Sequence, residues 1–174
     1  MGGFAHRKSA DSTTLQLPLL PPVSREVMQE RAENHPHPFR RKCSAQLLKA
    51  LDAGEPPITE VPQEIGTVVF GDNQLLLIAL SGEAVVDYSL KLKAAHGWEN
   101  TWVMAYTQLV PTYIPSAKVI EEGYYEGYDA IIIKGAWNTF DPAIEPMILN
   151  EVKTLLKNLN WQDPVIHAGE LARR

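Results

Sequence analysis

The segment GTVVFGDNQLLLIAL, residues 66–80, constrains the fold more than any other part of the chain. Its second half, Leu75–Leu80, is apolar at every position, and Gly71 and Asp72 are residue types that favour a tight turn. The pattern predicts a β-hairpin whose second strand is buried on both faces of a sheet. This strand is also the longest wholly apolar run, and it is far shorter than the roughly 20 residues that a membrane-spanning helix needs.

Strand and helix patterns alternate after this hairpin. The polar residues 81–83 predict a turn into a helix that ends at Gly97, since glycine is frequent just past the last turn of a helix. Residues 101–107 and 129–135 contain apolar runs that predict two further buried strands, and residues 142–158 predict a closing helix. The alternation indicates an α/β fold, a partial layered sheet with flanking helices. Because buried strands need neighbours on both sides, we expect a fragment of a larger α/β domain.

The N-terminal part of the chain carries weaker patterns. Residues 1–23 show no sustained period and predict a poorly ordered leader. Ser24 is a suitable N-cap for a short helix, which the prolines of residues 35–38 interrupt. A longer helix follows over residues 39–51, with Gly54 as its C-terminal cap. The expected organisation is a leader (1–23), one domain portion (24–160) and a tail (161–174).

Charge and composition exclude several classes of partner. The formal net charge is −5 and the pI is near 5.5, so the chain lacks the basic surface of a nucleic-acid-binding protein. Its one basic run, residues 40–42, suits a solvated helix face. The lone Cys43 excludes an internal disulfide and fits a reducing compartment. Residues 1–14 lack the apolar core of a signal peptide, so we expect a cytoplasmic protein with no transmembrane segment.

Two strand ends hold polar residues that could carry chemistry. In open α/β sheets, ligands bind beyond the carboxyl ends of the strands. Glu83 follows the buried strand directly, and Tyr113 lies in the loop after residues 101–107. Each of the two residues can also have a purely structural role, and spacing alone favours that role over a functional one. A carboxylate in the first turn of a helix is stabilised by about 0.3–1 kcal/mol, and a half-buried tyrosine can close a sheet edge.

Other candidate residues are weaker. His35 and His37 have the spacing of an H-x-H metal pair, but the prolines around them place them in a chain break with no completing ligand nearby. Cys43 lies on an apolar helix stripe and is expected in the core rather than as a nucleophile. The chain has no G-x-S-x-G elbow, glycine-rich phosphate loop or C-x-x-C pair. Residue types alone therefore predict no reaction.

Two longer motifs resemble one known family. FGDNQLLLIALSGEAVVDYSLKLK (70–93) and WVMAYTQLVPTYIPSAKVIEEGYYEG (102–127) are similar to the neutral/alkaline non-lysosomal ceramidases, above all to the bacterial branch. The resemblance extends over residues 36–158 and covers only the C-terminal part of the family's catalytic domain. It implies a zinc-dependent amidohydrolase that cleaves the N-acyl bond of ceramide or a related lipid amide.

The resemblance also implies a set of site residues. Family members hold zinc with two histidines from the N-terminal part of the catalytic domain and with a Glu and a Tyr from its C-terminal part. The last two match Glu83 and Tyr113. A further tyrosine near the scissile amide matches Tyr125, whose hydroxyl would donate to the developing oxyanion. The residues expected to flank the site and bind substrate are Tyr106, Gln108 and Ser116.

The implied metal site is incomplete in this chain. The sequence has no counterpart of the family's N-terminal region, so both histidine ligands are missing and a separate chain would have to supply them. Tyr124 is expected to pack, and Thr112 and Gln108 stand where a glycine and an asparagine are common in the family. Alone, the chain is expected to bind zinc weakly and to hydrolyse nothing.

Two other interpretations stay open. The chain could be a non-catalytic α/β module that binds a lipid or a partner chain through an unfinished sheet edge. It could also be a degenerate gene fragment that does not fold cooperatively. The unpatterned residues 1–23 favour the truncation of a longer protein.

Overall fold

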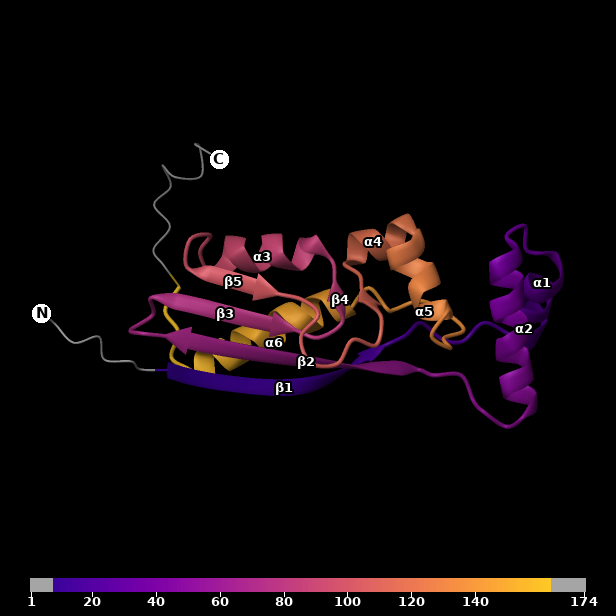
Figure 1. The fold of residues 1–174 in the computed structure, drawn as a ribbon, viewed down its shortest axis with the longest axis horizontal. Coiled ribbons are helices and arrows are strands. Elements are labelled where there is room, and N and C mark those ends of the chain that lie inside the picture. Colours follow the sequence, from indigo (N-terminus) through magenta and orange to yellow (C-terminus); the bar gives the residue numbers. More distant parts are fainter. Residues whose placement is uncertain (1–7, 164–174) are drawn as a thin grey trace, which may run out of the picture.

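The computed structural model describes residues 8–163, which form one main sheet with helices along it (Figure 1). Its strands lie in the order β1-β2-β3-β5. Neighbours among the first three are antiparallel, whereas β3 and β5 run parallel. The mixed α/β class predicted from the sequence is confirmed. The strands are β1 (Lys8–Pro18), β2 (Glu60–Phe70), β3 (Leu75–Leu80) and β5 (Thr101–Met104).

Strand β1 corrects the prediction of a poorly ordered leader over residues 1–23. It pairs with β2 along its whole length, from Lys8 opposite Phe70 to Pro18 opposite Glu60. The sequence pattern missed it because β1 is an edge strand whose exposed residues are mostly polar, with Ser, Thr and Gln alternating along it. Only the C-terminal end of β1, with the fully buried Leu17, reaches the core. Residues 1–7 lie outside the described part of the chain.

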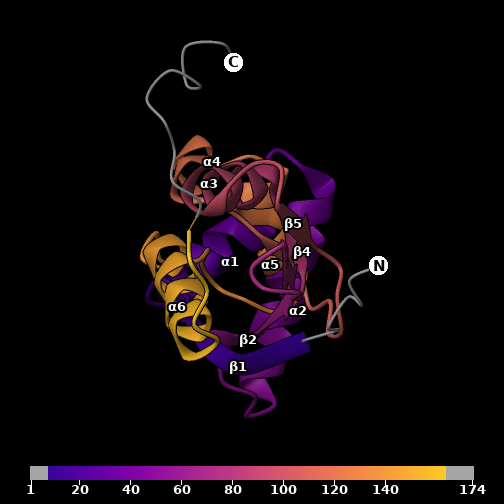
Figure 2. The same cartoon turned by 90° about the vertical axis from the view of Figure 1, so that its left-hand side faces the viewer.

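Helices α3 (Val86–His96) and α6 (Ile144–Asn158) cover one face of the sheet (Figure 2). The closing helix predicted over 142–158 is confirmed as α6, which contacts β1 and β2. Helix α3 connects β3 to its parallel neighbour β5, as the crossover of a parallel pair requires. Buried residues of this core include Leu76, Ile78 and Leu80 of β3, Leu92 of α3, and Ile148, Val152 and Leu155 of α6.

No helix of residues 8–163 runs along the opposite face of the sheet (Figure 2). Leu75, Leu77 and Ala79 of β3 point there and are only half-buried, so the predicted burial of β3 on both faces is wrong for this face. The predicted buried strand over 101–107 is likewise an edge strand. Its Trp102 and Met104 are 59% and 40% exposed. An apolar run predicts burial, but the run itself does not show which elements will pack against it or on which face.

Residues 125–132 are helical, which corrects the strand predicted over 129–135. A π-helical turn, η1 (Tyr125–Asp129), continues into α5 (Ala130–Ile132). A short apolar run does not distinguish a strand from a buried helix turn, and here helix contacts decide. Gly127 lies against α4 (Ala117–Glu122) so closely that a Cβ would meet Val119 O at 2.0 Å.

Helices α1 (Arg25–Asn34) and α2 (Pro38–Asp52) form a hairpin at one end of the molecule, beside α5 (Figure 1). Both were predicted, and the Ser24 hydroxyl accepts from Val27 N as the expected N-cap. At the other end of the chain, Trp161 of the predicted tail is 8% exposed and packs into the core. Residues 164–174 lie outside the described part. No helix within residues 8–163 is long and apolar enough to cross a membrane.

Candidate functional site

Two short strands, β4 (Glu83–Ala84) and β6 (Tyr113–Ile114), pair in parallel just beyond the end of β3. The pairing places Glu83 opposite Tyr113, and Glu83 N donates to Thr112 O at 2.9 Å. Gly82 allows this close approach. Its φ is +70°, and a Cβ there would lie 2.7 Å from Ile114 Cγ1 and 3.0 Å from Thr112 O. Only glycine fits this turn without strain.

The side chains around Glu83 form a polar cluster of phenols. Tyr106 Oη donates to Glu83 Oε2 at 2.9 Å. Hydrogen bonding to the Glu83 carboxylate raises the pKa of Tyr113 to about 12, because the phenolate would face a negative charge. The same carboxylate raises the pKa of Tyr106. Both phenols are therefore protonated donors at neutral pH.

Tyr125 completes this group, which we call the tyrosine cluster: Glu83, Tyr106, Tyr113 and Tyr125. The rings of Tyr113 and Tyr125 meet edge to face, with centroids 5.7 Å apart. This is a favourable geometry for aromatic pairs. Four residues that were singled out from the sequence, from three separate loops, thus lie together.

Tyr125 also lines a cavity of about 200 Å³ on its other side. Most of the cavity wall is apolar, and it comes from α2 with the residue before it and from η1 and α5. The buried Cys43 forms part of this wall, and burial raises the pKa of its thiol, so the predicted core role of Cys43 agrees with its surroundings. The lining residues are His37, Phe39, Arg40, Cys43, Tyr125, Asp129, Ile132 and Ile133.

Two of the expected substrate-binding residues lie apart from the tyrosine cluster. Ser116 is fully buried, and its hydroxyl caps α4 by accepting from Val119 N while it donates to Asp87 Oδ2 at 2.5 Å. Its role in the structure is therefore that of a helix cap. Gln108 is exposed in the loop before β6, with φ +56°. Tyr124, which was expected to pack, is 73% exposed.

Sequence reasoning missed the part that the α1–α2 hairpin plays beside Tyr125. The basic run over residues 40–42 was interpreted as a solvated helix face. Arg40 instead pairs with Asp129 at 2.5 Å and is only partly exposed. His37 lines the cavity next to Tyr125. The two prolines of residues 35–38 indicate that the chain turns between α1 and α2. No local pattern indicates where the resulting hairpin docks.

The donors around Glu83 fit two ligands of a zinc site and not a complete one. Glutamate oxygen is an ordinary zinc ligand, whereas a phenol binds a cation well only after losing its proton. Because Glu83 raises the pKa of Tyr113, a cation would have to reverse that shift. Within residues 8–163 no group of three or more His, Cys, Asp or Glu side chains gathers in a way that could hold a metal.

Comparison with models of protein families, with curated proteins and with solved structures found no match to this chain.

Proposed function

We propose that the chain is the C-terminal part of a zinc-dependent amidohydrolase of the neutral ceramidase type, inactive on its own. The proposal starts from the resemblance of residues 70–93 and 102–127 to that family. The observation that supports it is the tyrosine cluster. The two residues matched to metal ligands, Glu83 and Tyr113, are register partners of two adjacent short strands. If the motif match were a coincidence, there would be no reason for Glu83 and Tyr113 to lie next to each other.

Each member of the tyrosine cluster has a role in this proposal. Glu83 and Tyr113 would hold the metal, together with nitrogen ligands from another polypeptide. Zinc in such a site supplies an activated water and polarises an amide carbonyl. Tyr125, which is half-exposed and packs against the Tyr113 ring, would donate from its hydroxyl to the oxyanion that develops on the amide. Tyr106 would orient the Glu83 carboxylate through its hydrogen bond.

The cavity on the far side of Tyr125 supports a lipid-like substrate. Its walls include Phe39, Ile132 and Ile133, and Tyr125, the group that would act on the amide, lines it as well. An apolar chain gains free energy by leaving water for such a surface, at about 25 cal/mol per Å² buried. We therefore propose a lipid amide, with part of its apolar chain in this cavity.

A zinc titration of the full chain tests the metal assignment. With ¹³C-labelled tyrosine, weak zinc binding should shift the resonance of Tyr113 and leave that of Tyr124 in place. Glu83→Gln should abolish the shift of Tyr113, and Tyr113→Phe should abolish the zinc-dependent shift of Tyr106, whose hydroxyl donates to Glu83. Glu121→Gln, which removes an exposed carboxylate of α4, should leave both shifts in place. Shifts that survive both cluster substitutions would refute the assignment. Rapid hydrolysis of a ceramide analogue by the chain alone would refute the incomplete site.

A second candidate function is a non-catalytic module that binds a partner chain, and the uncovered face of the sheet favours it. Among the strands of residues 8–163, β5 is an edge that pairs on one side only, and its Trp102 and Met104 are exposed. A partner strand could extend the sheet there and cover this face. Co-expression with a polypeptide that carries further strands should then give a stable, monodisperse complex. Trp102→Lys should abolish that complex. A complex that keeps its affinity in Trp102→Lys would contradict this site.

A further inference from the structure

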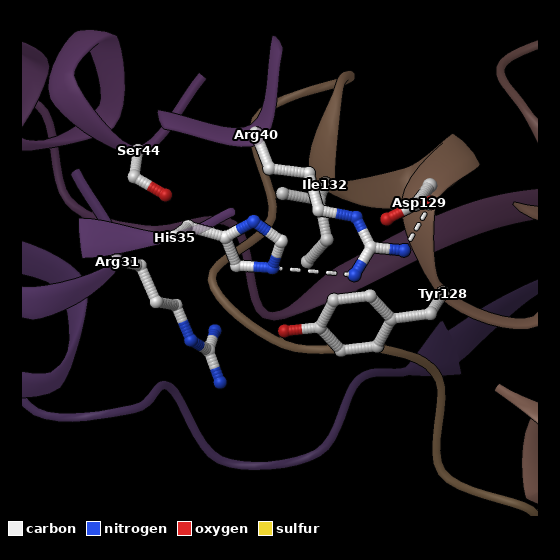
Figure 3. A pocket seen from close by; sticks show the side chains of 7 residues that line it. All are labelled: Arg31, His35, Arg40, Ser44, Tyr128, Asp129 and Ile132. Atoms are coloured by element: carbon white, nitrogen blue, oxygen red, sulfur yellow. Dashed lines mark hydrogen bonds and ion pairs between the residues drawn. The ribbon is translucent and has the colours of Figure 1, made fainter. Parts of the chain in front are cut away.

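A second cavity, of about 280 Å³, separates the α1–α2 hairpin from η1 and α5 (Figure 3). We call it the hairpin pocket. Its walls combine cationic and hydroxyl groups with an aliphatic side chain, and it is distinct from the tyrosine cluster. The residues that line it are Arg31, His35, Arg40, Ser44, Tyr128, Asp129 and Ile132.

The hydrogen bonds in this pocket lack one acceptor. His35 Nδ1 accepts from His37 N at 3.0 Å, which requires that Nδ1 carries no proton. A neutral ring then has its proton on Nε2, and this N–H faces Arg40 Nη1 at 3.4 Å. Two donors thus point at each other. The other tautomer would set Nδ1–H against the His37 backbone N–H, so the bond from His37 N favours the tautomer with the proton on Nε2. In that tautomer the pocket side of the ring lacks an acceptor.

The charges in the pocket leave one cation without a partner. Arg40 is neutralised by Asp129, at 2.5 Å. Arg31 pairs with no carboxylate within residues 8–163, and its guanidinium lies 5.9 Å from the ring centroid of Tyr128. Within residues 8–163, the pocket therefore holds one guanidinium, that of Arg31, which no carboxylate neutralises. Asp129 Oδ1 is buried without a partner and would repel a second negative charge, so the pocket suits a monoanion.

Polar and apolar groups share the remaining walls. Ser44 is 3% exposed, points into the pocket and makes no hydrogen bond with its hydroxyl in residues 8–163 (Figure 3). The Tyr128 hydroxyl also points inward, whereas the Tyr128 ring and Ile132 offer apolar contact. A dry cavity of about 150 Å³ is enough to bind benzene. The hairpin pocket therefore has room for a carboxylate with a small apolar group attached.

We propose that the hairpin pocket binds a small monoanionic carboxylate. One carboxylate oxygen accepts from His35 Nε2 and Arg40 Nη1, the acceptor that both lack. Arg31 and Ser44 bind the other oxygen, since a guanidinium suits planar carboxylate recognition. The apolar part of the ligand lies against Tyr128 and Ile132. The proposal does not depend on the metal assignment, because no member of the tyrosine cluster lines this pocket. The pocket does share Arg40, Asp129 and Ile132 with the cavity proposed for the lipid chain.

Calorimetric titration of the full chain with benzoate tests this site. Benzoate should bind, and benzyl alcohol, which has the same ring without the charge, should not. Arg31→Gln should weaken benzoate binding by roughly tenfold or more, the usual consequence of losing a hydrogen bond to a charged group. Ser44→Ala should weaken it less, and circular dichroism should show that both variants stay folded.

Lys42→Gln is the matched control, because it removes an exposed positive charge of α2 that does not line the pocket. It should leave benzoate affinity unchanged. The proposal is overturned if benzoate does not bind, or if Lys42→Gln and Arg31→Gln weaken it equally. It is also overturned if inorganic phosphate binds more tightly than benzoate at the same ionic strength.

Discussion

The tyrosine cluster and the hairpin pocket both bring together residues that are distant in the chain, but different forces hold them. In the cluster, the backbone sets the geometry: β4 and β6 pair, and Gly82 N donates to Leu109 O at 2.8 Å. In the hairpin pocket, side chains set it, chiefly the Arg40–Asp129 ion pair between α2 and η1. The first region is a separate two-stranded sheet that backbone hydrogen bonds, such as Thr107 N to Leu80 O, join to the end of β3. The second joins two units that have few other contacts.

This difference teaches where stability and adaptability lie in the molecule. A backbone-built corner opens only when the neighbouring sheet opens, because its hydrogen bonds continue those of β3. A pocket held by side chains can loosen locally, since each exposed or partly exposed ion pair contributes little. We therefore expect substitutions in the corner to affect the whole fold and substitutions in the pocket to affect the hairpin alone.

Gly82→Ala should have the largest effect. Alanine would have to adopt the left-handed conformation of Gly82, and its Cβ would also clash with Ile114 and Thr112. The free energy of unfolding should therefore fall by about 2–5 kcal/mol. Gly54→Ala, at the end of α2, is the control. Its φ is +87° but nothing lies within 4 Å, so about 1–2 kcal/mol is expected. Urea unfolding measures both, and equal losses would show that the corner is not tightly packed.

Arg40→Gln should have the next largest effect, and a local one. Loss of the pair with Asp129 leaves a partly buried carboxylate alone and should lower the local stability of the α1–α2 hairpin by about 1–2 kcal/mol. Amide hydrogen exchange should accelerate over residues 25–52 and stay unchanged in β2 and β3. The control is Arg25→Gln, which breaks the exposed pair with Asp52 and should change nothing measurable. Faster exchange in β2 and β3 would contradict the local role.

The contrast also explains which parts the sequence predicted. The Gly71-Asp72 turn and the GE turn after an apolar strand are local signals, and the β2–β3 hairpin and the position of Glu83 just after β3 follow from them. The helix start predicted at Glu83 is wrong, because Glu83 lies in β4 and α3 begins only at Val86. The docking of α2 on η1 depends on Arg40 and Asp129, which are 89 residues apart, and no local pattern encodes that pairing. The same limit applies to β1. Each residue of β1 pairs with one of β2, but the sequence of β1 alone gives no sign of this pairing.

Burial on the two faces of the sheet was predictable only in part. Leu75–Leu80 alternate between buried and half-buried positions, although every residue is apolar. Nothing in those six residues indicates that α3 and α6 pack on the same face. Residues 129–133 show the related limit, since their three isoleucines suit a strand as well as a helix and the contact of Gly127 with α4 decides.

Glu83→Gln should change the titration of Tyr113 while leaving the fold intact. The Glu83 carboxylate raises the pKa of Tyr113 to about 12, so the amide should return it toward about 10. The sign for stability follows: the raised pKa stabilises the folded state below pH about 10, and that stabilisation is lost as pH rises toward about 12. ¹³C-tyrosine spectra recorded from pH 8 to 12 measure the midpoint. A midpoint of Tyr113 that does not move would place Glu83 outside the cluster.

Tyr106→Phe should have the smallest effect, although it removes a hydrogen bond of the cluster. Its hydroxyl is exposed and water replaces it, so the urea midpoint should stay within error of the wild type. Tyr88→Phe is the contrasting change: its buried hydroxyl donates to Pro115 O at 2.9 Å, and the orphaned carbonyl should cost about 1–3 kcal/mol. If Tyr106→Phe were the more damaging of the two, side chains rather than the backbone would hold the corner. The distinction between the cluster and the hairpin pocket would then disappear.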